Sequence, residues 1–395
     1  MRRGVAFVAA AWLTSACTSG ADRSGTEDGA PPDTVFALQL ALIGELDGAQ
    51  EYLFGDISSA AAGPDGVIYV ADRIGSTVRA YDASGTYLGT VGSQGEGPGE
   101  FEWPSDLTFD DAGLLYARDQ ARISVFATGP DGEFADSLVR TIPLGRFLPW
   151  SAHGRVYGST YYFPSYYYFM FVTHRYFYQV YDSTGATGDT VPVPSLPNIL
   201  FLARANYLIN EEGGLNVDGI NLAPFEPRAT WDITPRGTLV TAEGAGYDIV
   251  EWGPAADTVR LISFDRDPRA VPDSEWRDSA RAFRERLDSV PVPLDDVNGM
   301  SDIARTRRPP DVLPEIHSIQ SDADGYLWVR RWPSEGGQTV FDVLDASGTP
   351  VRTVILAADL LSDPAPFVST ELVVGVVRDP ATGLERVAVF GALGW

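Results

Sequence analysis

The chain of 395 residues contains no lysine, so all 29 of its basic residues are arginines. The absence of lysine excludes Schiff-base chemistry, a lysine nucleophile and the lysine of a phosphate-binding loop. Cysteine occurs only once, at Cys17, and histidine only three times. Because no cysteine follows Cys17, the rest of the chain has no disulfide, thiolate nucleophile or zinc–thiolate site, and its stability must come from packing.

Positive charge is also scarce. The 29 basic residues face 54 acidic residues, which gives a formal net charge of −25. Such a charge repels nucleic acids and anionic lipid surfaces. We therefore expect no nucleic-acid partner, and contact with a membrane only through an anchor. Neither a G-x-S-x-G elbow nor an HExxH motif occurs, so a serine hydrolase and a zincin lack support.

The first residues indicate export. Two arginines precede a short apolar run that ends in "LTSAC" at Cys17, and the run is too short to span a bilayer. This ending resembles a bacterial lipobox, in which the cysteine is diacylated and becomes the new N-terminus. We expect a signal peptide over 1–17, lipidation of Cys17, and a flexible tether over 18–34, which is polar and rich in glycine and proline. The expected location is the cell envelope, with the lipid anchor in the outer membrane.

Four segments of the remaining chain share one pattern, a polar turn that ends in glycine and is followed by an apolar strand. They are "GPDGVIYVAD" (63–72), "DDAGLLYARD" (110–119), "TPRGTLVTAE" (234–243) and "DADGYLWVRR" (322–331). Alternation with a period of two predicts half-buried strands, and the glycine supplies the positive φ of a tight turn. A second hairpin follows most of them, so each repeat predicts four short antiparallel strands. Such a sheet cannot bury both of its faces alone, and the units must stack radially.

The glycine-rich stretch "GSQGEGPGEF" (92–101) looks at first like a phosphate-binding loop. A dinucleotide site needs a strand before the loop and a helix after it. No helical periodicity follows Phe101, and no lysine is available to contact a phosphate. The stretch is therefore predicted to connect two neighbouring repeats.

The repeats resemble six-bladed β-propellers of the NHL type, and more closely a group of bacterial lipoproteins with six-bladed propellers. The connector at 95–101, the "IGELDG" at 43–48, the repeated "DxxGxLxV" hairpins and "PFEPRATWDITPRG" carry this resemblance. It implies an all-β propeller over 35–395 in which an N-terminal strand, here within 34–46, completes the last blade. Six blades are predicted, although the long interval between Gly154 and Gly237 leaves seven open.

Two insertions interrupt the repeat. Residues 195–228 have the composition of an irregular loop. Residues 268–315 include 271–290, where Trp276, Ala280, Phe283 and Leu287 recur at helical spacing, so one helix is predicted there.

Candidate metal ligands are few. The resemblance to NHL proteins suggests a zinc site formed by three histidines, which here would be His153, His174 and His317. The repeat, however, places only His317 on an innermost strand. Propellers with hydrolase activity hold calcium with oxygen ligands, which here could come from Asp56, Asp106, Asp232 and Glu315. With 54 acidic residues, several must fall near the axis by chance. No cofactor is predicted.

The aromatic tract 161–181 is interpreted as a long hairpin that packs on a neighbouring blade, with exposed tyrosines for a glycan or protein as the alternative. We expect a monomeric binding or scaffold module, with a ligand at one mouth of the central channel and a protein or glycan of the cell envelope as partner. The predicted binding residues are Asp106, Trp150, Arg228, Trp231 and His317. The alternatives are a metal-dependent hydrolase or lyase, and a structural partner that docks through 268–315.

Overall fold

The turns that the repeats share reverse the chain direction because each contains a glycine with a positive φ, which other residues rarely adopt. The structure is a computed structural model that describes residues 23–24, 33–120, 122–127, 137–144, 154–158, 160–169, 173–182, 184–194, 208–209, 215–216, 225, 227, 229–254, 257–267, 269–288, 311–332 and 337–395. The four turn glycines have φ between 74° and 86°: Gly66, Gly113, Gly237 and Gly325. This left-handed region is open to glycine without strain.

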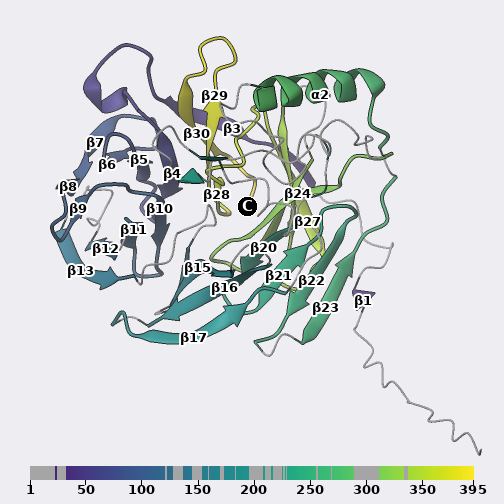
Figure 1. The fold of residues 1–395 in the computed structure, drawn as a ribbon, viewed down its shortest axis with the longest axis horizontal. Helices are drawn as coiled ribbons and strands as arrows, with labels where there is room; N and C mark the ends of the chain where they lie inside the picture. The colour runs from purple at the N-terminus through teal and green to yellow at the C-terminus, as the bar shows by residue number, and fades with distance from the viewer. Residues whose placement is uncertain are drawn as a thin grey trace, which may run out of the picture.

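Each repeat forms a four-stranded antiparallel sheet, and the sheets are arranged as blades around a common axis (Figure 1). Blade 1 contains β4 (Ile57–Ala62), β5 (Ile68–Asp72), β6 (Thr77–Tyr81) and β7 (Tyr87–Val91). Blade 2 contains β10 (Asp106–Phe109), β11 (Leu114–Arg118), β12 (Arg122–Ala127) and β13 (Ser137–Pro143). Blade 3 contains β14 (Arg155–Tyr157), β15 (Thr160–Phe169), β16 (Thr173–Tyr181) and β17 (Thr187–Pro192).

The second half of the ring repeats this order. Blade 4 contains β20 (Thr230–Ile233), β21 (Leu239–Ala242), β22 (Asp248–Trp252) and β23 (Thr258–Ser263). Blade 5 contains β24 (Ile316–Ser321), β25 (Leu327–Arg331), β26 (Thr339–Leu344) and β27 (Pro350–Leu356). Blade 6 contains β28 (Phe367–Val368), β29 (Val373–Arg378), β30 (Glu385–Gly391) and, from the N-terminus, β3 (Leu38–Ile43). The predicted six-bladed β-propeller is confirmed.

The N-terminal segment closes the ring, as predicted. β3 pairs antiparallel with β30 and is the outermost strand of blade 6. Before it, β2 (Asp33–Phe36) pairs in parallel with β27 of blade 5, and β1 (Arg23–Ser24) pairs in parallel with β23 of blade 4. We call β1, β2 and β3 the N-terminal strap, because it adds a strand to three successive blades. β1 and the first two residues of β2 lie within the segment expected to be a tether, whose other residues, like 1–17, fall outside the described part.

The hydrophobic core lies between neighbouring blades, where each sheet covers a face of the next. Ile43, Tyr81 and Val387 pack together where blades 6 and 1 meet. Trp328, Phe341 and Phe390 do the same between blades 5 and 6. Each blade therefore depends on its two neighbours for the burial of its apolar faces, which favours a closed ring over isolated sheets.

The glycine-rich stretch joins blade 1 to blade 2. Its ends form a short parallel pair of β8 (Ser93–Gln94) and β9 (Glu100–Phe101), and the Glu100 carboxylate accepts a hydrogen bond from the Gly97 N–H at 2.7 Å. A Cβ at Gly92 would lie 2.2 Å from the carbonyl oxygen of Gly99, so only glycine fits. The prediction that this stretch is a connector is confirmed.

The acidic residue that follows the second strand of the repeat has a structural role. Asp72 accepts hydrogen bonds from the backbone N–H groups of Gly55, Asp56 and Gly75. In blade 2, Asp119 accepts them from Glu102 and Trp103. In blades 1 and 2, these carboxylates satisfy the backbone of the loop that enters the first strand of the blade.

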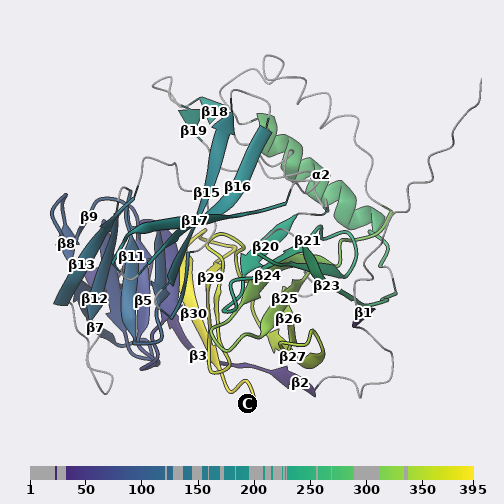
Figure 2. The ribbon, with the colours of Figure 1, turned by 90° about the horizontal axis from the view of Figure 1, so that it is seen from below.

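Both insertions lie on one side of the ring. The predicted helix is present as α2 (Asp273–Asp288), and Figure 2 shows it on the same side as the far ends of β15 and β16. Within the other insertion, β18 (Leu208–Ile209) pairs with β19 (Leu215–Asn216). A 3-10 turn, η1 (Gln50–Tyr52), precedes blade 1. In the described ranges, no helix has both the length and the apolar character needed to cross a membrane.

Candidate functional site

The central channel has two distinct ends because all innermost strands run in the same direction. We call the end where these strands begin the start mouth; it includes Asp106 of β10, Trp231 of β20 and His317 of β24. We call the other end, formed by the turns after the innermost strands (63–66, 110–113, 322–325 and 369–372), the end mouth. The second insertion, which contains α2, connects β23 to β24 on the side of the start mouth.

The residues predicted to bind a ligand belong to the start mouth. Trp150 and Arg228 lie outside the described residues. Asp106 is buried, and its carboxylate accepts a hydrogen bond from the Gly154 N–H of blade 3 at 2.7 Å, so it helps to join two blades. Trp231 is half-buried and packs in a small apolar cluster at blades 3 and 4.

Aromatic contacts link His317 to the helical insertion. The His317 ring lies 5.4 Å from the ring of Trp332, and Phe225 lies 6.3 Å from both Trp332 and Trp276 of α2. These are ring-centroid distances typical of packed aromatic pairs. His317 is therefore connected to α2 through two intervening aromatic rings.

Asp56, Asp106 and Asp232, three of the candidate metal ligands, form other polar interactions. Asp56 accepts a hydrogen bond from Nε of Arg73 at 2.6 Å, and Asp232 is paired with Arg155. Burial raises the pKa of Glu315, which opposes the charged form that a metal needs. His153 lies outside the described residues, and His174 is in β16. Within the described ranges, no three His, Cys, Asp or Glu side chains gather as an ion site requires.

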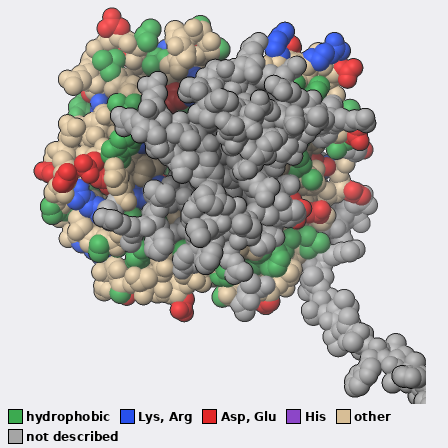
Figure 3. All heavy atoms as spheres, in the orientation of Figure 1, with side chains coloured by type: hydrophobic (Ala, Val, Ile, Leu, Met, Phe, Trp, Pro, Cys, Tyr) green, Lys and Arg blue, Asp and Glu red, His purple; other side chains and the backbone are tan. Residues whose placement is uncertain are grey.

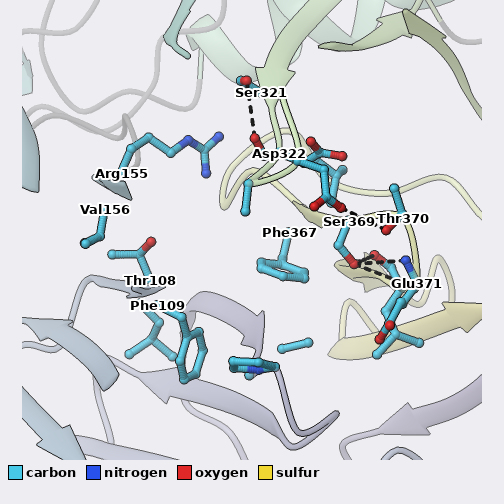
Figure 4. Close-up of a pocket in the computed structure, with 18 of the residues that line it drawn as sticks. Thr108, Phe109, Arg155, Val156, Ser321, Asp322, Phe367, Ser369, Thr370 and Glu371 are labelled. Atoms are coloured by element: carbon cyan, nitrogen blue, oxygen red, sulfur yellow. Dashed lines mark hydrogen bonds between the residues drawn. The ribbon is translucent and has the colours of Figure 1, made fainter. Parts of the chain in front are cut away.

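A cavity of about 320 Å³ opens at the end mouth. Its lining residues come from blades 1, 2, 3, 5 and 6: they belong to the innermost strands, to the turns that follow these strands and to the segment that enters β28. Figure 4 shows the ring of Phe367 at its centre, with Thr108, Phe109 and Arg155 on one side and Ser369 and Thr370 on the other. The volume is at the lower end of the range for small-ligand sites.

Arg155, which lines the cavity, belongs to a buried ion pair. The Arg155 guanidinium donates to both carboxylate oxygens of Asp232, at 3.2 and 3.1 Å from Nε and 2.7 Å from Nη2. Asp232 also accepts the Ser321 N–H at 2.8 Å. Side-chain exposure is only 16% for Arg155 and 5% for Asp232, so this bidentate pair is strongly shielded from water. It joins blades 3, 4 and 5 and holds the arginine in one orientation.

Carboxylates surround the opening of the cavity, and hydrogen bonds between neighbouring turns position two of them. The Gly158 N–H of blade 3 donates to Asp111 of blade 2 at 3.1 Å. The Thr370 hydroxyl of blade 6 donates to Asp324 of blade 5, also at 3.1 Å. Because each bond crosses from one blade to the next, the closed ring arranges these groups before any ligand arrives.

Asp322 is the most deeply buried carboxylate of the cavity. It accepts hydrogen bonds from the indole Nε1–H of Trp328 and the backbone N–H of Tyr326, both at 2.8 Å. These hydrogen bonds lower the pKa of Asp322, but burial has the larger effect and raises it to about 6. This carboxyl therefore changes charge within a mildly acidic range.

Figure 3 shows the face of the propeller opposite the end mouth. Acidic side chains are scattered around the rim of this face, and basic side chains gather over α2. Arg277 and Arg281 of α2 are exposed, and among the described residues their ion pairs are with Asp273 and Asp278 of the same helix.

Sequence reasoning missed the residues of the cavity, although the repeat contained a signal for them. In blades 2 and 5, the residues four and three positions before the turn glycine are Phe109 and Asp110, and Ser321 and Asp322. All four line the cavity. Aligning the repeats on their turn glycines would have predicted that these positions converge.

Comparison with known proteins agrees with the fold. Residues 45–129, which include blade 1 and three strands of blade 2, match the family DUF5128, described as a 6-bladed beta-propeller. No curated protein matches the chain.

Several solved structures match the chain over most of its length at low identity. One is a Bacteroides fragilis protein inferred to be exported, with 12% identity, a TM-score of 0.45 and coverage of 91% of this chain and 99% of that one. A member of the DUF4221 family from Bacteroides vulgatus has 13% identity, a TM-score of 0.48 and coverage of 90% and 97%. Virginiamycin B lyase from Staphylococcus aureus has 11% identity, a TM-score of 0.36 and coverage of 88% and 86%.

Proposed function

We propose that this chain is an exported binding module whose propeller takes a small ligand at the end mouth. The observation that carries the proposal is the cavity, where aromatic, carboxylate, hydroxyl and guanidinium groups from five blades converge. An apolar pocket with a few convergent polar groups is the usual form of a small-ligand site. The inter-blade hydrogen bonds to Asp111 and Asp324 hold it in place.

The expected attachment to the envelope fits this role. We propose that Cys17 carries the lipid, that the anchored protein acts as a monomer, and that the outer membrane is its location. A net charge of −25 opposes direct contact of the propeller with anionic lipid, so the anchor would be its only membrane contact. Fractionation of cells that produce the wild-type protein or Cys17→Ser tests this proposal: the wild type should be found with membranes, and the variant should be released from them.

Binding at the end mouth can be tested without knowledge of the ligand. A thermal-shift screen of chemically diverse small molecules should raise the melting temperature of the wild-type protein for at least one class. The shift should disappear in Phe367→Ala and persist in Phe36→Ala, a matched control on the N-terminal strap whose side chain is 72% exposed. Hits that persist in Phe367→Ala would place the binding site elsewhere.

A structural role in an envelope complex is the second candidate, because α2 carries exposed arginines in an otherwise acidic chain. In that case an acidic partner protein would contact Arg277 and Arg281. Co-purification from cells should then be lost in the double variant Arg277→Glu/Arg281→Glu while the thermal-shift hits remain.

A further inference from the structure

The side chains at the end mouth impose three requirements on a ligand, and together these requirements limit its chemical class. The first is an apolar surface. Phe367 and Phe109, both half-buried, present aromatic rings to the cavity, and the Phe109 ring is held by Tyr69 at a centroid distance of 5.4 Å. A ligand must therefore offer at least one face of C–H groups if these rings are to lose contact with water favourably.

The second requirement is a hydrogen-bond acceptor for Arg155. Nε and Nη2 of this arginine are used by Asp232, whereas Nη1 has no partner among the described residues. Figure 4 shows the guanidinium extending from β14 toward Ser321 and Asp322, across the space beside Phe367. A ligand with no acceptor, such as a simple alkylammonium ion, would leave this donor buried and unsatisfied, which is costly.

The third requirement is hydrogen-bond donors, because five carboxylates line the cavity: Asp110, Asp111, Asp322, Asp324 and Glu371. Within the described part of the chain, none of them forms an ion pair. Several already accept bonds from neighbouring turns, but each carboxylate oxygen has two lone pairs and can accept more. Their combined charge also repels any anionic ligand.

We infer that the ligand is a neutral carbohydrate. A pyranose ring has a face of C–H groups for Phe367 and Phe109, and its hydroxyl groups donate to carboxylates while they accept from Arg155. Anions conflict with the carboxylates, alkylammonium ions leave Nη1 of Arg155 without an acceptor, and purely apolar molecules would desolvate every polar group of the cavity. This inference rests on the proposed binding function and adds the class of ligand.

The inference can be tested by saturation-transfer NMR on the full-length protein with a panel of probes. The panel contains neutral mono- and disaccharides of glucose, galactose, mannose and N-acetylglucosamine, with galacturonate as the anion and spermidine as the cation. At least one neutral saccharide should receive saturation, and galacturonate and spermidine should not. Phe367→Ala should weaken saccharide binding by about tenfold or more, and Phe36→Ala should leave it unchanged.

Glu371→Gln separates hydrogen bonding from charge, and the exposed Glu371 is unimportant for folding. Glutamine retains an acceptor oxygen but loses the charge that strengthens its hydrogen bonds, so affinity for a neutral saccharide should fall by about threefold, whereas a cationic ligand would lose about tenfold or more. Saturation of spermidine alone, or of no neutral saccharide, would overturn the inference. If the thermal-shift screen still gives hits of another class that depend on Phe367, the proposed function stands and only the carbohydrate is wrong. If the screen gives none, both fail.

Discussion

The two ends of the channel are made from the same repeat but differ in what surrounds them. At the start mouth, long insertions lead into the innermost strands β20 and β24, and aromatic contacts lead from His317 through Trp332 toward α2. At the end mouth, only short turns follow the strands, and a cavity remains. The comparison teaches that the repeat itself leaves an opening at the end mouth, whereas α2 and the long insertions lie on the side of the start mouth.

Charge is also used differently at the two ends. Near the start mouth, carboxylates serve the fold: Asp72 and Asp119 accept backbone N–H groups, and Asp56 pairs with Arg73. At the end mouth, the one lining arginine is paired with Asp232 from outside the cavity, and the lining carboxylates have no arginine partner in the described ranges. Carboxylates in a cavity that have no ion-pair partner are candidates for ligand binding, whereas carboxylates paired with arginine or with backbone N–H groups contribute to the stability of the fold.

The largest effect is expected when Arg155 loses its partner. Asp232→Ala leaves a shielded guanidinium and the Ser321 N–H unsatisfied, which should lower the free energy of unfolding by about 3–5 kcal/mol. Chemical denaturation measures this loss. Asp111→Ala is the control, because it removes a bond at an exposed turn and should cost less than about 1 kcal/mol. Equal losses in the two variants would show that the ion pair does not support the end mouth.

A pair of aromatic substitutions should separate the two ends. Trp276→Ala removes the contact of α2 with Phe225 and should cost about 1–3 kcal/mol, since Trp276 is only half-buried. Ligand binding should be unchanged. Phe367→Ala should cost a similar amount and abolish binding. Loss of binding in Trp276→Ala would move the site to the start mouth.

The raised pKa of Asp322 predicts a smaller, pH-dependent effect. Because its folded pKa of about 6 lies above the ordinary value of 3.8, its protonated form favours the folded state, and that stability is lost as the pH rises from about 4 through 6. Over this range the wild type should lose up to about 3 kcal/mol relative to Asp322→Asn. Denaturation of both proteins at pH 4, 5, 6 and 7 measures the difference. Parallel pH profiles would contradict the assigned burial.

The smallest effect is expected from metal removal. Since no ion site is formed by the described residues, chelator should change the melting temperature by less than about 1 °C. Metal analysis of the purified protein provides the control. A stoichiometric ion whose removal lowers the melting temperature would instead support the metal-dependent hydrolase or lyase.

The fold could be predicted from the sequence because it follows from local rules that recur. Turn glycines, alternating strands and the connector at 92–101 each specify their own conformation, and the apolar 34–46 had no partner other than the last blade. The parallel pairing of β1 and β2 could not be predicted, since it depends on where the ring closes. The cavity was missed because it depends on which residues of five distant segments converge in space. The prediction instead chose residues near the beginnings of the innermost strands, and these lie at the start mouth.

The most direct test of the account uses the absence of cysteine after Cys17. In a Cys17→Ala background, Thr108→Cys places one thiol in the cavity, and His317→Cys places one at the start mouth. A small thiol reagent should modify Thr108→Cys much faster than His317→Cys, and this modification should abolish ligand binding. An unreactive thiol at position 108, together with a reactive one at position 317, would contradict the claim that the end mouth is the open binding site.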